Sequence, residues 1–158
     1  MRRGVLLACC LLLAACGFQL QGRRHLPPAL ATLELDATDS HSDFTVALQR
    51  ALRGAGAKIV EHAGQDDGVV RIVHDEVTER VMSVNPRNIP TDYELVYEVE
   101  VTVRAGGEEL LTDQQFSLSR IYSFDETKVL AKEREKDVLR AALARDMASV
   151  VLRRLSSL

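Results

Sequence analysis

The sequence predicts an α+β fold, a two-layer sandwich in which two helices pack on one face of a three- to four-stranded sheet. The predicted element order is β-α-β-β-β-α. Two observations lead to this fold class. Apolar and polar residues alternate in several segments through the middle of the chain, as they do in half-buried strands. Two other segments, one early and one at the end of the chain, carry apolar residues at helical spacing.

The early part of the chain predicts a strand followed by a helix. Residues 32–36 alternate in polarity, which indicates a short strand. An apolar stripe at helical spacing runs through residues 43–55, and Ser42 offers a side-chain oxygen that can cap the first turn. Gly54 and Gly56 are expected to end this helix.

The middle of the chain predicts the rest of the sheet. The candidate strands are residues 58–61, which are brief, and then residues 69–84, 93–104 and 114–122. Within the first long strand the apolar residues change parity, which predicts a bulge or a strand covered on both faces. The two prolines of residues 85–92 indicate a rigid loop, and Gly106 with Gly107 marks a hairpin.

The end of the chain predicts a long second helix. From about Asp125 the apolar residues return to helical spacing, and the stripe continues to Leu155. Residues 132–137, near the start of this helix, are almost all charged. Arg153 and Arg154 suit the negative C-terminal end of a helix.

The first residues have the features of a secretory signal. Arg2 and Arg3 precede an uninterrupted apolar run from Val5 to Ala15. That run is too short to cross about 30 Å of hydrocarbon as a helix. A basic start, a short apolar run and small residues at the processing site are typical of a signal peptide that is removed from the mature protein.

The end of this signal resembles the lipobox of bacterial lipoproteins, in which the cysteine of Leu-Ala-Ala-Cys is acylated and becomes the mature N-terminus. Two or more acyl chains anchor a protein stably to a membrane. Gly17 stands where inner-membrane retention usually places Asp, which favours the outer membrane. The alternative is an ordinary secreted protein cleaved after Ala15. The predicted organisation is a lipoprotein signal peptide (1–15), the acylated Cys16 with a tether (16–28), and a single periplasmic α/β domain (29–158).

Composition excludes several classes of protein. The chain has 158 residues, of which 46% are apolar, and a formal net charge of -3. This length suits one domain of ordinary size, and the apolar fraction is too high for a wholly disordered chain. The negative charge argues against a general nucleic-acid binder, which needs a basic face.

The sequence offers little for catalysis. The four histidines are never spaced as in HExxH, no CxxC occurs, and P-loop, GxGxxG and GxSxG motifs are absent, so we expect no metal and no cofactor. His74, Asp75 and Glu76 are adjacent in a predicted strand, where neighbours face opposite sides and cannot converge. We therefore expect a protein that is not an enzyme. A lipid-anchored hydrolase is an alternative that would need a nucleophile, a base and an oxyanion site in one place.

Basic residues are the more informative candidates. Because the mature chain is negative overall, any anion site must be local. Arg87 lies between two prolines, and Arg120 lies at a strand end. The remaining candidates surround the start of the last helix: Lys128, Lys132, Arg134 and Lys136. Of these, Lys132 and Lys136 are one helical turn apart and share a face. The alternative is that these lysines only pair with neighbouring acids on a solvated surface.

Three stretches carry a resemblance to a known family. They are LAACGFQL at residues 13–20, the basic loop and Tyr-rich strand of residues 83–99, and RIYSFD at 120–125 running into VLAKE at 129–133. In order and spacing they resemble LptE, the lipopolysaccharide-assembly lipoproteins of Gram-negative outer membranes. The agreement extends over nearly the whole mature chain.

The resemblance implies a two-helix, four-stranded α/β sandwich that plugs the lumen of the β-barrel LptD. It implies lipopolysaccharide as the ligand, with Arg87 and Lys132 at the basic positions that contact its lipid A phosphates. Arg120 and Lys136 are further candidates for phosphate binding. The hypothesis is an outer-membrane lipoprotein that plugs the export barrel, supports its assembly and binds lipopolysaccharide during delivery. The alternative is a lipoprotein that acts as a protein-protein adaptor in another envelope assembly complex.

Overall fold

The computed structural model describes residues 26–124 and 129–158. The predicted signal peptide, Cys16, most of the tether and Lys128 lie outside the described residues. The elements are a 3-10 helix η1 (Pro28–Leu30), β1 (Thr32–Ala37), α2 (Asp43–Gly54), β2 (Lys58–Val60), β3 (Gly68–Val84), β4 (Pro90–Ala105), β5 (Glu108–Ser123) and α3 (Val129–Leu155).

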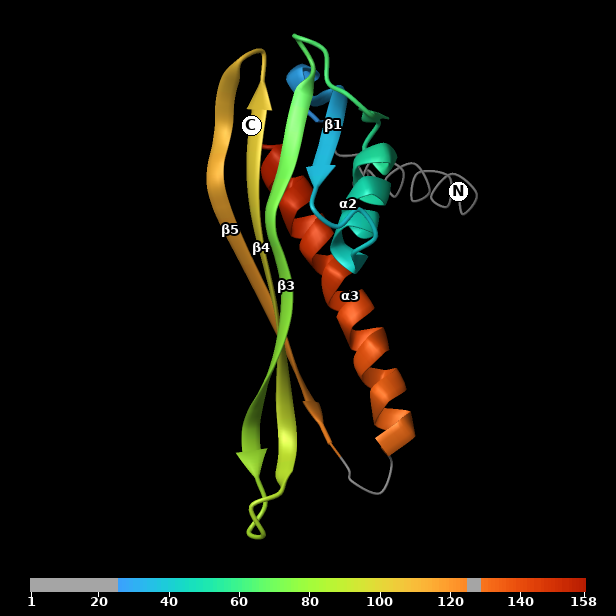
Figure 1. The fold of residues 1–158 in the computed structure, drawn as a ribbon, viewed down its shortest axis with the longest axis vertical. Coiled ribbons are helices and arrows are strands. Elements are labelled where there is room, and N and C mark those ends of the chain that lie inside the picture. The colour runs from blue at the N-terminus through green and yellow to red at the C-terminus, as the bar shows by residue number, and fades with distance from the viewer. Residues whose placement is uncertain (1–25, 125–128) are drawn as a thin grey trace, which may run out of the picture.

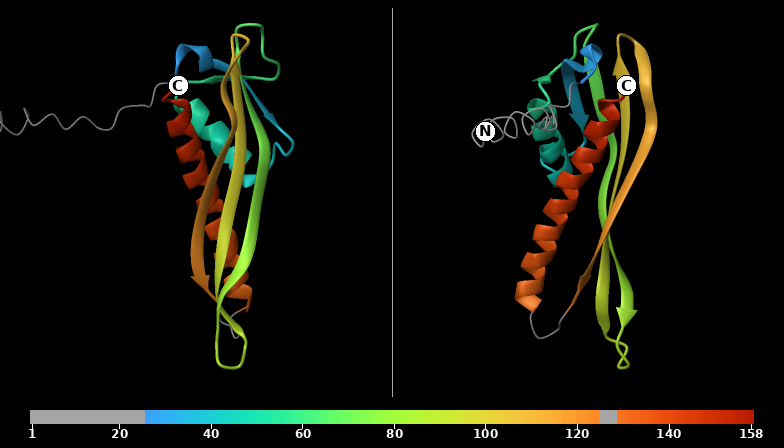
Figure 2. Two further views of the ribbon diagram at one scale, coloured as in Figure 1. Left: turned by 90° about the vertical axis from the view of Figure 1, so that its left-hand side faces the viewer. Right: turned by 180° about the vertical axis from the view of Figure 1, so that it is seen from behind.

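The strands form one sheet with the order β2-β1-β3-β4-β5. β1 is parallel to both of its neighbours, whereas β3, β4 and β5 form an antiparallel meander. Both helices lie on the same side of this sheet (Figures 1 and 2). The predicted two-layer α+β sandwich is therefore confirmed. The sheet of the described residues has five strands, because the brief segment at 58–60 pairs with β1 as an edge strand.

Local sequence accounts well for α2. The Ser42 hydroxyl accepts a hydrogen bond from the backbone N–H of Thr45 at 3.0 Å, so the predicted cap is present. The apolar stripe is buried on the sheet side, where the ring of Phe44 lies 6.3 Å from that of Tyr97. The chain then leaves the helix through Gly56, whose φ of 97° is left-handed and suits glycine.

The long strands differ from the prediction in two places, because β5 begins at Glu108 and not at residue 114, and β4 also begins earlier than residue 93. Pairing of β3 with β4 shifts between Ile72 and His74 and again beyond Val81, which confirms the bulge that the change of parity predicted. β4 begins at Pro90, so the predicted loop is shortened to residues 85–89. Proline is tolerated as the first residue of a strand, because the N–H that it lacks is not needed there for a hydrogen bond of the sheet. The Asn85 side chain closes the turn by accepting hydrogen bonds from two backbone N–H groups within it.

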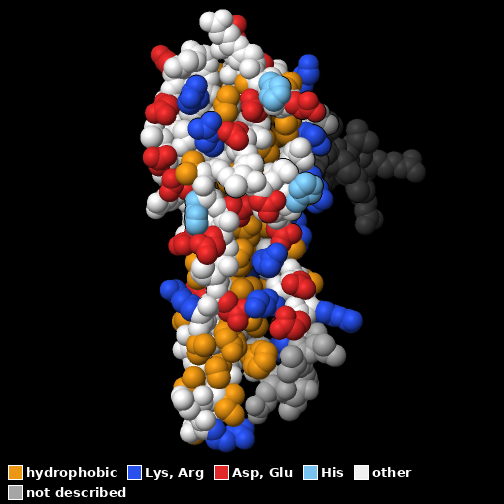
Figure 3. Space-filling model, viewed as in Figure 1, with side chains coloured by type: hydrophobic (Ala, Val, Ile, Leu, Met, Phe, Trp, Pro, Cys, Tyr) orange, Lys and Arg blue, Asp and Glu red, His pale blue; other side chains and the backbone are white. Residues whose placement is uncertain are grey.

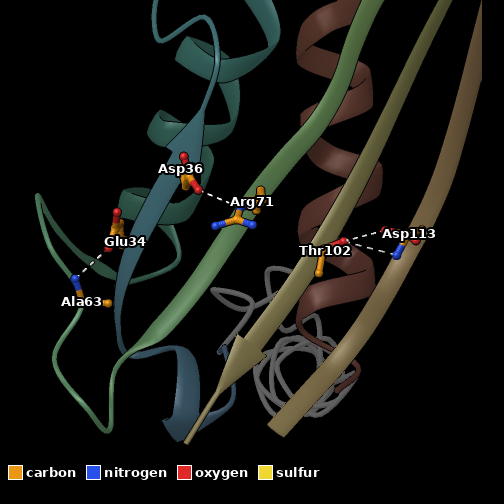
Figure 4. Close-up of polar contacts among 6 residues, drawn as sticks. All are labelled: Glu34, Asp36, Ala63, Arg71, Thr102 and Asp113. Atoms are coloured by element: carbon orange, nitrogen blue, oxygen red, sulfur yellow. Dashed lines mark hydrogen bonds and ion pairs between the residues drawn. The ribbon is translucent and has the colours of Figure 1, made fainter. Parts of the chain in front are cut away.

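Polar side chains tie the strands together at the end of the sheet that contains β1 (Figure 4). Arg71 of β3 pairs with Asp36 of β1 at 2.7 Å. Across the other strand pair, the Thr102 hydroxyl donates to Asp113 at 3.0 Å, beside the irregular pairing of β4 with β5. These contacts join neighbouring strands in the part of the sheet where all five strands are present.

Three strands continue beyond the end of β1, whose last partner on β3 is Ile72. We call this extension the distal ribbon; it comprises residues 74–84 of β3, 90–100 of β4 and 115–123 of β5. It points away from β1, and the first turns of α3 lie at the same end of the molecule (Figure 1). At its base the distal ribbon still contacts the start of α2, through Ser42 with Asp75 and Phe44 with Tyr97. Farther along, α3 is the described helix that contacts it.

The core lies between the two helices and the inner face of the sheet. Its largest fully buried side chains, each less than 2% exposed, are Phe44, Leu30, Leu33, Leu48, Leu52, Leu95, Leu143, Met147, Leu155, Val70, Val99 and Val101. Gly68 opens β3 against this core, where the chain approaches η1 closely. A Cβ atom at Gly68 would lie 2.6 Å from Leu30 Cδ2 and 3.1 Å from the carbonyl oxygen of Ala29.

We predict that Gly68→Ala lowers the free energy of unfolding by about 1–3 kcal/mol, because the fully buried Leu30 has little room to move away. Urea unfolding followed by circular dichroism measures the change. Gly54→Ala is the matched control, since a Cβ there meets nothing within 4 Å at the end of α2, and it should change stability by less than about 1 kcal/mol. Equal stability of the two variants would contradict the predicted clash.

Candidate functional site

Four cations are predicted to bind phosphate, namely Arg87, Arg120, Lys132 and Lys136, and three of them lie at the distal end of the molecule. Arg87 is exposed in the turn between β3 and β4, and its backbone N–H donates to the Asn85 side chain at 2.9 Å. Lys132 and Lys136 lie in the first turns of α3, which begins at the same end as this turn (Figure 1). Arg120 lies farther from the tip, on β5. The fold thus places residues that are far apart in the sequence at the same end of the molecule.

Lys132, Lys136 and Arg120 each have a carboxylate partner within the chain. Arg120 reaches from the inner face of β5 to Asp146 of α3, with 2.8 Å between Nη2 and Oδ2. Lys132 pairs with Glu135 at 2.7 Å, one of the local acids that the sequence suggested. Lys136 instead pairs across the layers with Glu79 of β3. The basic groups are therefore held in defined positions by acids.

Glu79 joins the helix to the aromatic part of the distal ribbon. Its carboxylate raises the pKa of Lys136 above the usual value, since the ion pair stabilises the charged ammonium. Burial and the same carboxylate raise the pKa of Tyr122 to about 12. The Tyr122 ring stacks on Tyr93 with 5.8 Å between centroids, and Phe124 meets Tyr93 edge-on. Cations and aromatic rings thus meet on the inner side of the ribbon.

Half-exposed apolar side chains add to this end of the molecule. Val81 and Met82 are each 49% exposed, Val84 is 50% exposed, and Ile121 is 62% exposed. Figure 3 shows hydrophobic side chains gathered over the distal ribbon, with a basic side chain at its tip. A surface of this kind fits a ligand that carries both negative charges and apolar groups.

A polar cluster holds the ends of the three ribbon strands together. Asp92 of β4 accepts hydrogen bonds from the hydroxyls of Ser83 and Ser123, and these bonds lower its pKa. On the outer face, the Glu94 carboxylate is close to Arg80, with 2.6 Å between Nε and Oε2. Hydrogen bonds from Ser119 and then Arg80 lower the pKa of Glu94. These carboxylates remain charged and fix the ribbon beneath the candidate site.

The residues His74, Asp75 and Glu76 separate as predicted. His74 and Glu76 share the outer face, with 3.4 Å between His74 Nε2 and Glu76 Oε2. Asp75 faces the helices, where Ser42 donates a hydrogen bond to it. Across the described ranges, no group of three or more His, Cys, Asp or Glu side chains is placed to hold a metal ion. Nor does any helix in them have the length and apolar character needed to cross a membrane.

Glu79 and Asp146 were not among the predicted site residues, although they pair with Lys136 and Arg120. A signal for Glu79 was present, because it shares the parity of Val77 and Val81 in β3 and so belongs to the inner face. An acid on an apolar face usually has a basic partner. Asp146 gives no comparable signal, since the tilt of α3 across the sheet decides that it meets Arg120.

The family comparison covers most of the chain. Residues 30–155 match the sequence model of the family described as LptE, lipopolysaccharide-assembly. The LPS-assembly lipoprotein LptE of Pectobacterium atrosepticum is 29% identical over 146 residues, which span 92% of this chain and 79% of the relative. The matched segment contains every described element from β1 to α3.

Solved structures show the same fold. The rare lipoprotein B of Shewanella oneidensis has a TM-score of 0.72 at 29% identity, covering 80% of this chain and 94% of that protein. The solution structure of an uncharacterized lipoprotein B from Nitrosomonas europaea has a TM-score of 0.74 at 27% identity, covering 89% of this chain and 91% of that protein. Sequence, element order and architecture agree, and the chain belongs to the LptE family of lipopolysaccharide-assembly lipoproteins.

Proposed function

We propose that this chain is an outer-membrane lipoprotein that occupies the lumen of the β-barrel LptD, supports the assembly of that barrel and binds lipopolysaccharide on its way to the cell surface. The distal end of the molecule is the observation that carries the ligand part of this proposal. There Arg87 lies in the turn of the distal ribbon, whose strands carry half-exposed apolar side chains, and Lys132 and Lys136 lie in the first turns of α3 at the same end of the molecule. Lipid A has this pair of features itself, since it carries phosphates on an acylated sugar.

Arg87 and Lys132 are the principal phosphate-binding residues of the proposal, and Arg120 and Lys136 assist them. Charge-assisted hydrogen bonds from guanidinium and ammonium groups to phosphate are among the strongest polar contacts in proteins. By taking phosphate oxygens, these residues compete with the divalent cations that crosslink neighbouring lipopolysaccharide molecules. The lipopolysaccharide aggregate is thereby loosened, and a single lipopolysaccharide molecule can be transferred. Binding and release suffice for this role, and no covalent bond changes.

The shape and polarity of the domain support the barrel part of the proposal. The outer face of the sheet carries polar side chains, including Glu98, Thr102 and Arg104 of β4. A polar face suits the water-filled interior of a transmembrane barrel, whose lumen side is itself polar. The acylated Cys16 and the tether would place the domain on the periplasmic side of the outer membrane, next to the barrel's opening.

Reversing the two principal charges tests the ligand site. We predict that Arg87→Glu/Lys132→Glu weakens binding of purified lipopolysaccharide at least about tenfold, because each lost contact to phosphate costs about 1.5–3 kcal/mol. Fluorescence titration with labelled lipopolysaccharide measures the affinity. Arg53→Glu/Arg104→Glu is the control, with the same change of net charge at the end of the fold away from the tip. Binding that is equal in both double variants would reject Arg87 and Lys132 as the site.

Copurification tests the barrel partner. We predict that the tagged chain, extracted from outer membranes in mild detergent, carries LptD with it at about one to one. The Arg87→Glu/Lys132→Glu variant should keep this association, because shape and polar contacts over the whole domain hold it in the lumen. Recovery of a different envelope complex without LptD would instead support the adaptor function.

The lipid anchor has its own test. We predict that Cys16→Ala abolishes incorporation of labelled palmitate, because acylation begins on the cysteine sulfur. The double variant Cys9→Ala/Cys10→Ala should remain labelled, since both residues belong to the removed signal. Palmitate in the Cys16→Ala protein would show that the lipobox assignment is wrong.

A further inference from the structure

Glu79 forms an ion pair with Lys136, one of the cations that the proposed function assigns to the binding of lipopolysaccharide. The inference that follows rests on that function and concerns the same site. We propose that the Glu79 carboxylate is an internal competitor for the ligand: it holds the Lys136 ammonium in the ligand-free protein, and a phosphate of the bound glycolipid displaces it. This competition determines which anions Lys136 can bind. The loss of the Glu79–Lys136 pair also frees the start of α3 from the distal ribbon.

The Glu79–Lys136 pair is better shielded from water than the other cross-layer pair. The side chains of Lys136 and Glu79 are 34% and 26% exposed, against 46% and 54% for Arg120 and Asp146. Partial burial lowers the local dielectric and strengthens the attraction between two charges. A weak anion therefore cannot take Lys136 from Glu79, whereas a phosphate that carries more charge than a carboxylate can.

The acids around Lys136 further restrict which anions can bind to its ammonium group. Its ammonium faces Glu79 from β3, and Glu133 and Asp137 from its own helix, and all three acids favour its charged form. Any anion that approaches Lys136 meets their repulsion. Removing the Glu79 charge should lower this barrier most, since Glu79 is the one in direct contact with the ammonium.

The same pair also fixes the position of α3. The helix crosses the sheet obliquely and leans away from the distal ribbon toward its own start (Figures 1 and 2). Among the described residues, Lys136–Glu79 and Arg120–Asp146 are the ion pairs that link α3 to the ribbon strands. When a phosphate takes Lys136, the link nearer the start of the helix is lost. Ligand binding and attachment of the helix therefore oppose each other through one side chain.

Neutralising the acid tests this competition in the full mature lipoprotein. We expect Glu79→Gln to bind purified lipopolysaccharide about three- to tenfold more tightly than the wild type. The control Asp36→Asn removes the acid of the Asp36–Arg71 pair between β1 and β3 (Figure 4), outside the distal ribbon, and should bind like the wild type. In a Lys136→Gln background, Glu79→Gln should have no effect on affinity, because the cation it competes for is gone.

Amide hydrogen exchange provides a second readout. Exchange in residues 132–140 should rise when lipopolysaccharide is added to the wild type, and Glu79→Gln should show the raised exchange without ligand. Lower thermal stability of Glu79→Gln with unchanged affinity would overturn the inference and leave Glu79 a purely structural residue. Wild-type protein that binds no lipopolysaccharide would overturn the proposed function itself. Tight wild-type binding with no gain in Glu79→Gln would overturn the competition alone.

Discussion

The fold depends on the burial of one apolar layer between the two helices and the inner face of β4. Phe44 and Leu48 of α2 and Met147 of α3 are fully buried in it, opposite Val99 and Val101. A three-stranded ribbon without such a layer would be marginally stable in water. The layer is thickest where β1 and α2 add to it, and it thins where the three long strands continue past Ile72. The distal ribbon can extend because the other half of the sheet is firmly held.

Polar contacts supplement apolar burial in the distal ribbon. Asp92 joins the strand ends through hydroxyl groups, Glu94 pairs with Arg80, and Glu79 joins the ribbon to α3. Contacts between charged groups near water each contribute little to stability, and other ions can exchange into them. The part of the fold least protected by burial is therefore also the part able to respond to an anionic ligand.

Local patterns were enough to predict α2, the long strands and the bulge in β3, because each depends on spacing within a few residues. The loop at 85–92 was predicted too long, since a proline such as Pro90 can begin a strand as well as interrupt one. The pairs Lys136–Glu79 and Arg120–Asp146 could not be derived in this way. They depend on strand register together with the angle at which α3 crosses the sheet, and neither quantity is encoded in a short window of sequence.

The proposed function requires an anionic chain to bind an anionic glycolipid, so its charges have to be separated in space. Charges in 0.15 M salt are screened beyond about 8 Å, so the excess of acids elsewhere in the chain has little effect at the tip of the distal ribbon. Lys132 first has to be exchanged from Glu135, and Lys136 from Glu79, before either ammonium contacts a phosphate. Affinity at such a site is set by the few acids next to each cation more than by net charge. A relative could therefore tune its binding by changing Glu79 alone while keeping every cation in place.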